Sequence, residues 1–202
     1  MLIVISYPTA VRDEATIINA LFDDGLEIFH MRKPDTDVDE LRKLLEKINP
    51  TYHHRIALHQ HHEIAADYGI KRWHFTEVNR NKINEEALTQ LKMANHILST
   101  SIHQVEAFKG LPLSFDYTFF GPVLNSISKQ GYISSLPADF IFPVEVNHPT
   151  LVALGGIDAT TIHQVKLMQF KAIAVLGAIW QKPDESIQQF KAVQKAWMQT
   201  GR

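Results

Sequence analysis

Short apolar segments alternate with amphipathic segments along the whole 202-residue chain, and this alternation constrains the fold more than any other feature. Several apolar segments are continuously apolar, which is typical of strands buried on both faces of a parallel sheet. Eight strands are predicted, at Leu2–Ser6, Glu27–Met31, Arg55–His59, Arg72–Thr76, Asn95–Thr100, Tyr117–Gly121, Leu151–Gly155 and Ala172–Gly177.

The segments between the strands have helical periodicity. Apolar residues recur at spacings of three and four over residues 38–48 and again over residues 187–197, which predicts two amphipathic helices. Gly25, Gly69 and Gly110 each follow a helical pattern and precede a strand. We expect each of these glycines to end its helix in a left-handed conformation.

Eight strands joined by helices predict a single (β/α)8 barrel, an α/β fold, as one domain over residues 1–202. A doubly wound open sheet is the alternative, which strand counting alone does not exclude. The sixth helix should lie within Ser134–Pro149, where three prolines predict a short or irregular connection. The chain has no Pro/Gly/Ser-rich linker and no charge block that would mark a domain boundary.

Composition narrows the classes of partner. The formal net charge of −2 favours neither nucleic acid nor an anionic membrane as a partner. The chain has no cysteine, which excludes disulfides, thiolate metal ligands and thiol nucleophiles. The first residues lack the pattern of a signal peptide, and no apolar run approaches the roughly 20 residues of a membrane span. We therefore expect a cytoplasmic protein.

Turns that contain glycine end the last two predicted strands, at Gly155-Gly156 and at Gly177-Ala178. In a barrel of this type, chemistry takes place at the carboxyl ends of the strands, and the seventh and eighth strands commonly bind phosphate. Successive glycines let backbone N–H groups approach a phosphate closely. Two such turns at one corner favour a phosphate site over two simple tight turns.

Other strand ends carry polar side chains that suit an anion. Ser126, Ser128 and Lys129 lie in a long loop after the sixth strand, where they form either a mobile anion clamp or a solvated surface loop. Arg32 follows the second strand, where it binds a carboxylate or phosphate or else forms a salt bridge at the rim.

Histidines also cluster at the strand ends. His103, just after Ser101 on the fifth strand, is a candidate proton-transfer base. The tract 59–62 together with His74 raises the possibility of a metal site. Catalytic metal sites in barrels usually include carboxylate ligands, whereas position 60 is Gln60. His61 and His62 should begin a helix and point away from His59. We therefore predict no metal site.

At this point an ordered set of motifs resembles the thiamine-phosphate synthase/TenI family, whose members are (β/α)8 barrels of similar length. No single motif is decisive, but six in register are specific. They are His30-Met31-Arg32-Lys33-Pro34, Trp73-His74-Phe75-Thr76-Glu77, Ser101-Ile102-His103, Asp116-Tyr117 through Gly121-Pro122-Val123 to Ser128-Lys129, Val152 to Ile157, and Ile173 to Ile179.

Departures from the family pattern bear on the activity. Synthases of this family join a pyrimidine diphosphate to a thiazole phosphate and bind Mg²⁺ through two aspartates, whose positions here hold Gln60 and Asn79. Neutral amides remove the charge that Mg²⁺ needs. The family's Gln and Asn at two further positions are His30 and His59, which are candidate pocket residues together with His74. The pyrophosphate side of the synthase site is thus changed, while the phosphate corner is retained.

The resemblance therefore implies a TenI-like protein that binds a small phosphorylated thiazole. The activity implied for that branch is tautomerisation of a thiazole phosphate carboxylate to its aromatic form, with the base at His103 and no metal or organic cofactor. A thiamine-phosphate synthase that uses Mg²⁺ and a rebuilt diphosphate site (His59, His61 and Lys33) is the first alternative. A non-catalytic thiazole-phosphate binding or regulatory protein is the second. The family resemblance also makes a homo-oligomer plausible.

Overall fold

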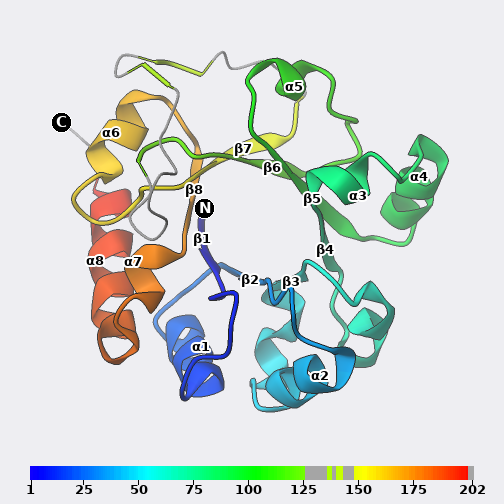
Figure 1. The fold of residues 1–202 in the computed structure, drawn as a ribbon, viewed down its shortest axis with the longest axis horizontal. Coiled ribbons are helices and arrows are strands. Elements are labelled where there is room, and N and C mark those ends of the chain that lie inside the picture. The colour runs from blue at the N-terminus through cyan, green and yellow to red at the C-terminus, as the bar shows by residue number, and fades with distance from the viewer. Residues whose placement is uncertain (126–135, 138–139, 143–147, 200–202) are drawn as a thin grey trace.

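The computed structural model describes residues 1–125, 136–137, 140–142 and 148–199. Its eight strands form a closed, all-parallel barrel in which each strand pairs with the next and β8 pairs with β1 (Figure 1). The closed sheet confirms the barrel and excludes the open doubly wound sheet. The strands are β1 Leu2–Ile5, β2 Ile28–Met31, β3 Ile56–Leu58, β4 Arg72–Phe75, β5 Ile97–Ile102, β6 Tyr117–Phe120, β7 Thr150–Leu154 and β8 Ala172–Val175.

All eight predicted strands are present, and their bounds differ from the predictions by a few residues at most. The largest extension is at β5, which runs on to Ile102 and so brings Ser101 into the strand rather than the following loop. Ser101 pairs in register with Phe119 of β6. Tertiary pairing with β6 therefore lengthens β5 beyond the strand that its own sequence predicts.

Strand alternation divides the apolar side chains into two layers. On β2, Ile28 belongs to the core inside the barrel, whereas Phe29 and Met31 belong to the core between the barrel and its helices. Successive strand residues point to opposite faces, so His30 shares the interior with Ile28. The inner core is small and consists of Ile3, Ile5, Ile28, Tyr117, Phe119, Val152, Ala172 and Ala174.

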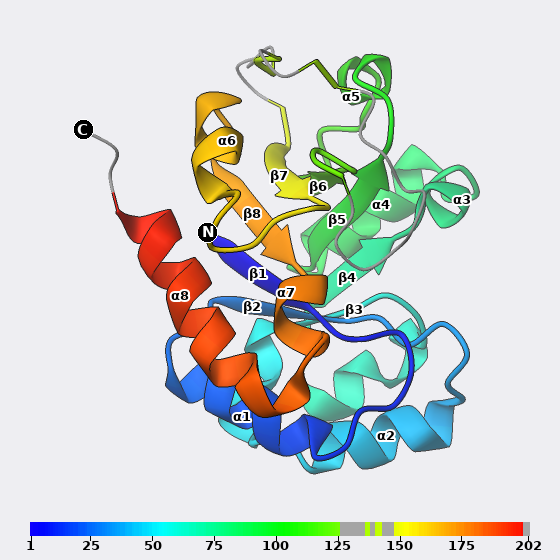
Figure 2. The same ribbon diagram turned by 60° about the vertical axis from the view of Figure 1, so that its left-hand side comes forward.

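Helices and one-turn helical segments surround the barrel (Figures 1 and 2). The predicted helices at 38–48 and 187–197 correspond to α2 and α8. Gly25 and Gly69 have the expected left-handed conformation, but the prediction for Gly110 was wrong, because its φ is −91° at the end of a one-turn helix. The helices are α1 Glu14–Asp23, α2 Val38–Glu46, α3 Glu77–Arg80, α4 Glu85–Met93, α5 Glu106–Lys109, α6 Ile162–Leu167, α7 Gly177–Trp180 and α8 Ser186–Met198, with 3-10 helices at Pro50–Arg55, His62–Tyr68 and Pro183–Glu185.

Apart from residues 200–202 at the C-terminus, all residues that the structure does not describe lie in the connection between β6 and β7. Its described residues, 121–125, 136–137, 140–142 and 148–149, contain no helix, in keeping with the proline-rich sequence. Phe142 from this connection is buried in the outer core.

The first and last α-helices of the chain lie side by side. Helix α8 lies beside α1, where Lys191 forms a 3.0 Å ion pair with Asp24 and Gln194 donates a 3.2 Å hydrogen bond to the Asp24 carbonyl (Figure 2). None of the helices in the described ranges has the length and apolar character needed to cross a membrane.

Candidate active site

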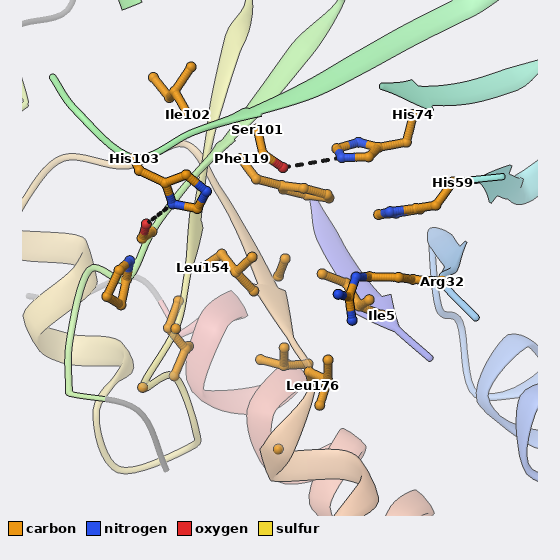
Figure 3. A pocket seen from close by; sticks show the side chains of 18 of the residues that line it. Ile5, Arg32, His59, His74, Ser101, Ile102, His103, Phe119, Leu154 and Leu176 are labelled. Atoms are coloured by element: carbon orange, nitrogen blue, oxygen red, sulfur yellow. Dashed lines mark hydrogen bonds between the residues drawn. The ribbon is translucent and has the colours of Figure 1, made fainter. Parts of the chain in front are cut away.

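A cavity of about 340 Å³ lies at the carboxyl ends of the strands. In Figure 3, His59, His74 and Arg32 lie on one side of this cavity and His103 on the other, with Leu154 and Leu176 between them. Most of the site predicted from the sequence is therefore brought together. The lining residues are Ile5, Arg32, His59, His74, Thr76, Glu77, Ser101, Ile102, His103, Phe119, Gly121, Pro122, Leu154, Gly155, Gly156, Ile157, Ala174, Val175, Leu176, Gly177 and Ala178.

The imidazole of His103 is fixed by one backbone group. Its Nδ1 lies 2.7 Å from the carbonyl oxygen of Gly121, at the end of β6. A carbonyl oxygen can only accept a hydrogen bond, so Nδ1 carries the proton and donates it. In the neutral imidazole Nε2 is then the unprotonated nitrogen, and it lies on the side of the ring that faces the cavity (Figure 3).

The end of β5, just before His103, is held by Arg80. The Arg80 guanidinium donates hydrogen bonds of 2.6 Å to the Ser101 carbonyl and 3.0 Å to the Thr100 hydroxyl. The same guanidinium forms a 3.3 Å ion pair with Glu77, three residues earlier on α3. Three partners on one planar cation orient this strand end, so Arg80 positions the segment that carries His103.

Gly155 and Gly156 form the turn after β7, and both have positive φ, at 97° and 72°. A Cβ added at Gly156 would lie 2.4 Å from the carbonyl oxygen of Asn125, and one at Gly155 would lie 2.9 Å from Pro122. The glycines are therefore required by the close approach of the loop after β6. This close packing also leaves the turn lining the cavity through backbone alone.

Gly177 and Ala178 begin α7 directly after β8 and line the same end of the cavity. The first N–H groups of a helix have no acceptor within that helix. Together with the turn at Gly155-Gly156, they give this corner of the cavity a surface of backbone and small residues. Such a surface suits a phosphate group.

His30, His59 and His74 form a cluster of buried imidazoles at the opposite side. Nδ1 of His30 lies 2.9 Å from Nε2 of His59, and the rings of His59 and His74 stack with centroids 3.9 Å apart. The other ring nitrogen of His30, Nε2, lies 2.7 Å from the Tyr117 hydroxyl. His59 and His74 line the cavity, whereas His30 lies behind them in the barrel interior.

Burial sets the protonation of this cluster. Loss of solvation lowers the pKa of His30 and of His59 well below the ordinary value for histidine, and lowers the pKa of His74 to about 3. Mutual repulsion with neighbouring imidazoles and with arginines acts in the same direction. All three imidazoles are consequently neutral near pH 7.

Arg32 supplies a guanidinium to the cavity. Its backbone is fixed on both sides by Ser6, whose hydroxyl accepts from the Arg32 N–H at 2.7 Å and donates to the Arg32 carbonyl at 2.9 Å. Its side chain, by contrast, forms no hydrogen bond or ion pair with the described residues. A fixed backbone and an unpaired guanidinium suit the binding of an anionic ligand.

Several residues singled out in the sequence lie away from the cavity. Gln60 donates a 2.6 Å hydrogen bond to the Lys33 carbonyl, and Asn79 is exposed on α3. His61 and His62 point away from His59, with Nε2 atoms 3.0 Å from the Thr36 carbonyl and 2.9 Å from the Leu58 carbonyl, respectively.

Lys33 is likewise held by the protein itself. Its ammonium group forms a buried 2.7 Å ion pair with Glu14 and donates a 2.7 Å hydrogen bond to the Thr9 carbonyl. Ser126, Ser128 and Lys129, which form the anion clamp predicted from the sequence, lie outside the described residues.

Sequence reasoning missed Ser99, Tyr117, Phe119 and Arg80. The first three belong to strand positions that alternation directs into the barrel, and Tyr117 and Phe119 lie in its inner core. The two-residue period of β5 and β6 was therefore the signal that identifies them. Arg80 offered no such signal, because its partners are 20 and 21 residues away in sequence.

Comparisons with known proteins bear on the family and the fold of the chain. The family model described as thiamine monophosphate synthase matches residues 1–179. A thiamine phosphate pyrophosphorylase from Bacteroides thetaiotaomicron is 26% identical with a TM-score of 0.75, and the match covers 100% of this chain and 99% of that chain.

Two further solved structures share the fold at lower identity. A thiamine phosphate pyrophosphorylase from Pyrococcus furiosus is 16% identical with a TM-score of 0.74, covering 97% of this chain and 94% of that one. A 3-hexulose-6-phosphate synthase from Salmonella typhimurium is 15% identical with a TM-score of 0.68, covering 98% and 99%. No match is found among curated proteins.

Proposed function

The chain belongs to the thiamine monophosphate synthase family, and from that premise we propose that it is a thiazole-phosphate tautomerase in which His103 moves the proton. The observation that carries this proposal is the hydrogen bond from His103 Nδ1 to the Gly121 carbonyl. It leaves Nε2 as the basic nitrogen at the edge of the cavity. A neutral imidazole with one unprotonated ring nitrogen can accept a proton from a bound substrate.

The proposed reaction is a proton shift without redox change. His103 Nε2 removes a proton from one carbon of the non-aromatic thiazole phosphate carboxylate, and a proton is delivered to a second carbon as the ring becomes aromatic. The substrate and the product have the same atoms and the same charge. The reaction therefore needs a base and an anchor for the substrate, but no electron acceptor and no organic cofactor.

Two groups at different parts of the cavity support binding of a substrate with two anionic ends. The backbone corner at Gly155, Gly156, Gly177 and Ala178 suits the phosphate. The unpaired guanidinium of Arg32 suits the carboxylate. Ser126, Ser128 and Lys129, outside the described residues, are proposed to assist at the phosphate.

A thiamine-phosphate synthase is the second candidate, favoured by the family match and by the Bacteroides thetaiotaomicron structure. It would require Mg²⁺ at the diphosphate. Gln60 and Asn79, at the positions where the resemblance places the magnesium ligands, do not line the cavity, and Glu77 is the one carboxylate among its described lining residues. This difference ranks the synthase below the tautomerase.

The test supplies the purified protein with the non-aromatic tautomer of thiazole phosphate carboxylate and follows aromatisation by absorbance. Loss of a positioned general base lowers kcat by about 10²- to 10⁴-fold, which is the result expected for His103→Ala. His163→Ala is the matched control, because His163 is exposed on α6 and lies outside the cavity.

Unchanged turnover in His103→Ala would overturn the assignment of the base. The wild-type protein would be a synthase if it left the tautomer unchanged but released pyrophosphate from a pyrimidine diphosphate and thiazole phosphate in the presence of Mg²⁺. Saturable binding of thiazole phosphate without either reaction would establish a binding protein.

A further inference from the structure

The buried cluster of His30, His59 and His74 has the arrangement of a set of metal ligands. One ring nitrogen from each imidazole lies within 4.8 Å of one from each of the others. The three side chains come from β2, from the residue after β3 and from β4, which are adjacent strands of the barrel. The rigid sheet therefore holds these imidazoles together, without any contribution from a loop further along the chain.

Hydroxyl groups orient the outer nitrogens of two of these rings. The Tyr117 hydroxyl lies 2.7 Å from Nε2 of His30, and the Ser99 hydroxyl lies 2.9 Å from Nδ1 of His74. Histidines that bind metals almost always use their second ring nitrogen in this way, which fixes the ring orientation and the tautomer. The nitrogens left to converge are Nδ1 of His30, Nε2 of His59 and Nε2 of His74.

We propose that His30, His59 and His74 bind one divalent transition-metal ion of the zinc class. Imidazole nitrogens suit Zn²⁺, Cu²⁺ and Ni²⁺, whereas Mg²⁺ requires hard oxygen ligands. The ion would replace the proton shared by the 2.9 Å pair of His30 and His59. It would also displace the Ser101 hydroxyl, which lies 3.1 Å from Nε2 of His74.

The distances allow such an ion after a small adjustment. Zinc–nitrogen bonds of about 2.0–2.1 Å in a tetrahedral site separate the ligand atoms by about 3.4 Å. The pair of His30 and His59 is already closer than this. All the ligand atoms lie within 4.8 Å of one another, so the widest pair has to close by at most about 1.4 Å, and the pair of His30 and His59 has to open by about 0.5 Å. Rotation of the rings, which unstacks His59 from His74, would make both changes.

The fourth coordination position would face the cavity. His59 and His74 both line it, and so does the unpaired guanidinium of Arg32. Three protein ligands with one open position are typical of zinc sites that bind a ligand oxygen. The ion and Arg32 together would select an anionic oxygen, so this site goes beyond the proton shift proposed for His103.

Two of the three histidines of this cluster, His59 and His74, were candidates for a metal site in the sequence, and His30 was not. The sequence predicts no metal site for residues 59–62 with His74, because His61 and His62 were expected to point away, and they do. We depart from that prediction on the geometry of His30, His59 and His74. His30 completes the cluster from a strand that had not been included. It also stands, like His59, at a position where the resembled family has an amide, so both departures lie side by side.

The test uses protein without a polyhistidine tag, stripped with a chelator, incubated with Zn²⁺ or Co²⁺ and then freed of unbound metal. Elemental analysis is expected to give one metal ion per chain, and Co²⁺ is expected to produce the visible absorption of a four-coordinate site. His30→Gln and His59→Asn, which restore the amides of the family pattern, are expected to weaken Zn²⁺ binding by more than 100-fold. Ser99→Ala is expected to weaken it by about 10- to 100-fold through His74.

His163→Gln and His61→Gln are the matched controls, because both imidazoles lie outside the cluster. Metal retention that is equal in His30→Gln, His59→Asn and the wild-type protein would overturn the proposal, and so would a failure of the wild-type protein to retain Zn²⁺. Circular dichroism identifies a variant that fails to fold. The stoichiometry is measured without substrate, so failure of the metal site is distinguished from failure of the tautomerase.

Discussion

The two sides of the cavity are built differently. On the side of β2 to β4, polar side chains bond to one another or to backbone: His30 to Tyr117, Lys33 to Glu14 and Gln60 to the Lys33 carbonyl. On the side of β7 and β8, the lining is backbone at the two turns together with apolar side chains such as Leu154 and Leu176. The first side thus keeps its polar groups for internal contacts, except Arg32, whereas the second leaves its backbone turns lining the cavity.

This difference is consistent with the proposed function, in which the side of β2 to β4 does not bind a pyrophosphate. The resemblance to the synthases places the pyrophosphate on the side of β2 to β4, where Lys33 and Gln60 are now occupied. The glycine corner lines the cavity, where we propose that it binds the phosphate. Under the proposed function, the phosphate half of the family's site is kept, while the polar groups of the other half bond within the protein or take a different ligand.

The largest effect is expected at the Lys33–Glu14 pair. Lys33→Met leaves a carboxylate that is 5% exposed without its cation, so we expect the free energy of unfolding to fall by about 3–5 kcal/mol. Lys33→Met combined with Glu14→Leu removes both charges and should restore stability to near the wild-type value. Urea unfolding measures both effects. A loss of thiazole phosphate binding in the stable double variant would show instead that Lys33 serves the ligand.

The next effect is expected at Gly156. Gly156→Ala combines a left-handed φ, which costs about 1–2 kcal/mol, with a steric clash against Asn125 and Leu124, and should lower stability by about 2–4 kcal/mol. Gly69→Ala is the matched control, because Gly69 has a φ of 66° but no atom within 4 Å of the added Cβ. Equal losses in the two variants would contradict the close packing inferred for the β7 corner.

A smaller effect is expected at Arg32, and it should appear in binding rather than in stability. Hydrogen bonds to charged groups contribute about 1.5–3 kcal/mol, so Arg32→Ala should weaken binding of a thiazole phosphate carboxylate by about 10- to 100-fold. The melting temperature should stay unchanged, because this side chain has no partner in the described structure. Arg12→Ala, at a side chain that is 94% exposed, controls for net charge in the titration calorimetry. Unaltered affinity would remove Arg32 from the site.

The smallest effect concerns pH. Burial lowers the pKa of His62, which stacks on Trp73 with ring centroids 4.6 Å apart. Below pH 6.5 the unfolded chain binds a proton at this residue that the folded protein does not, so the free energy of unfolding decreases as the pH falls from 6.5 toward the lowered pKa.

His62→Phe keeps the stacking and removes this proton. Between pH 7.5 and 5.5 the wild-type protein should lose up to about 1 kcal/mol more stability than the variant. The same comparison for His163→Phe, on the exposed surface of α6, should show no such difference. Parallel pH profiles for the wild-type protein and His62→Phe would contradict the assignment of a neutral His62 in the folded state.

The sequence by itself determined the order of elements and the end of the barrel that carries the site. Eight apolar segments separated by helical patterns predicted the barrel, because a buried parallel strand must be apolar on both faces. The fold rule alone placed Arg32, Ser101, His103 and the two glycine turns together, because each lies at the carboxyl end of its predicted strand.

Only the tertiary structure decided which polar groups are used internally. His30 meets Tyr117 from 87 residues away, and Lys33, after β2, meets Glu14 at the start of α1. Local pattern cannot specify such pairs, because they depend on barrel register and on which strands become neighbours. The same register turned His30, His59 and His74 into one cluster, since side chains that point inward from adjacent strands share the small space inside a closed barrel.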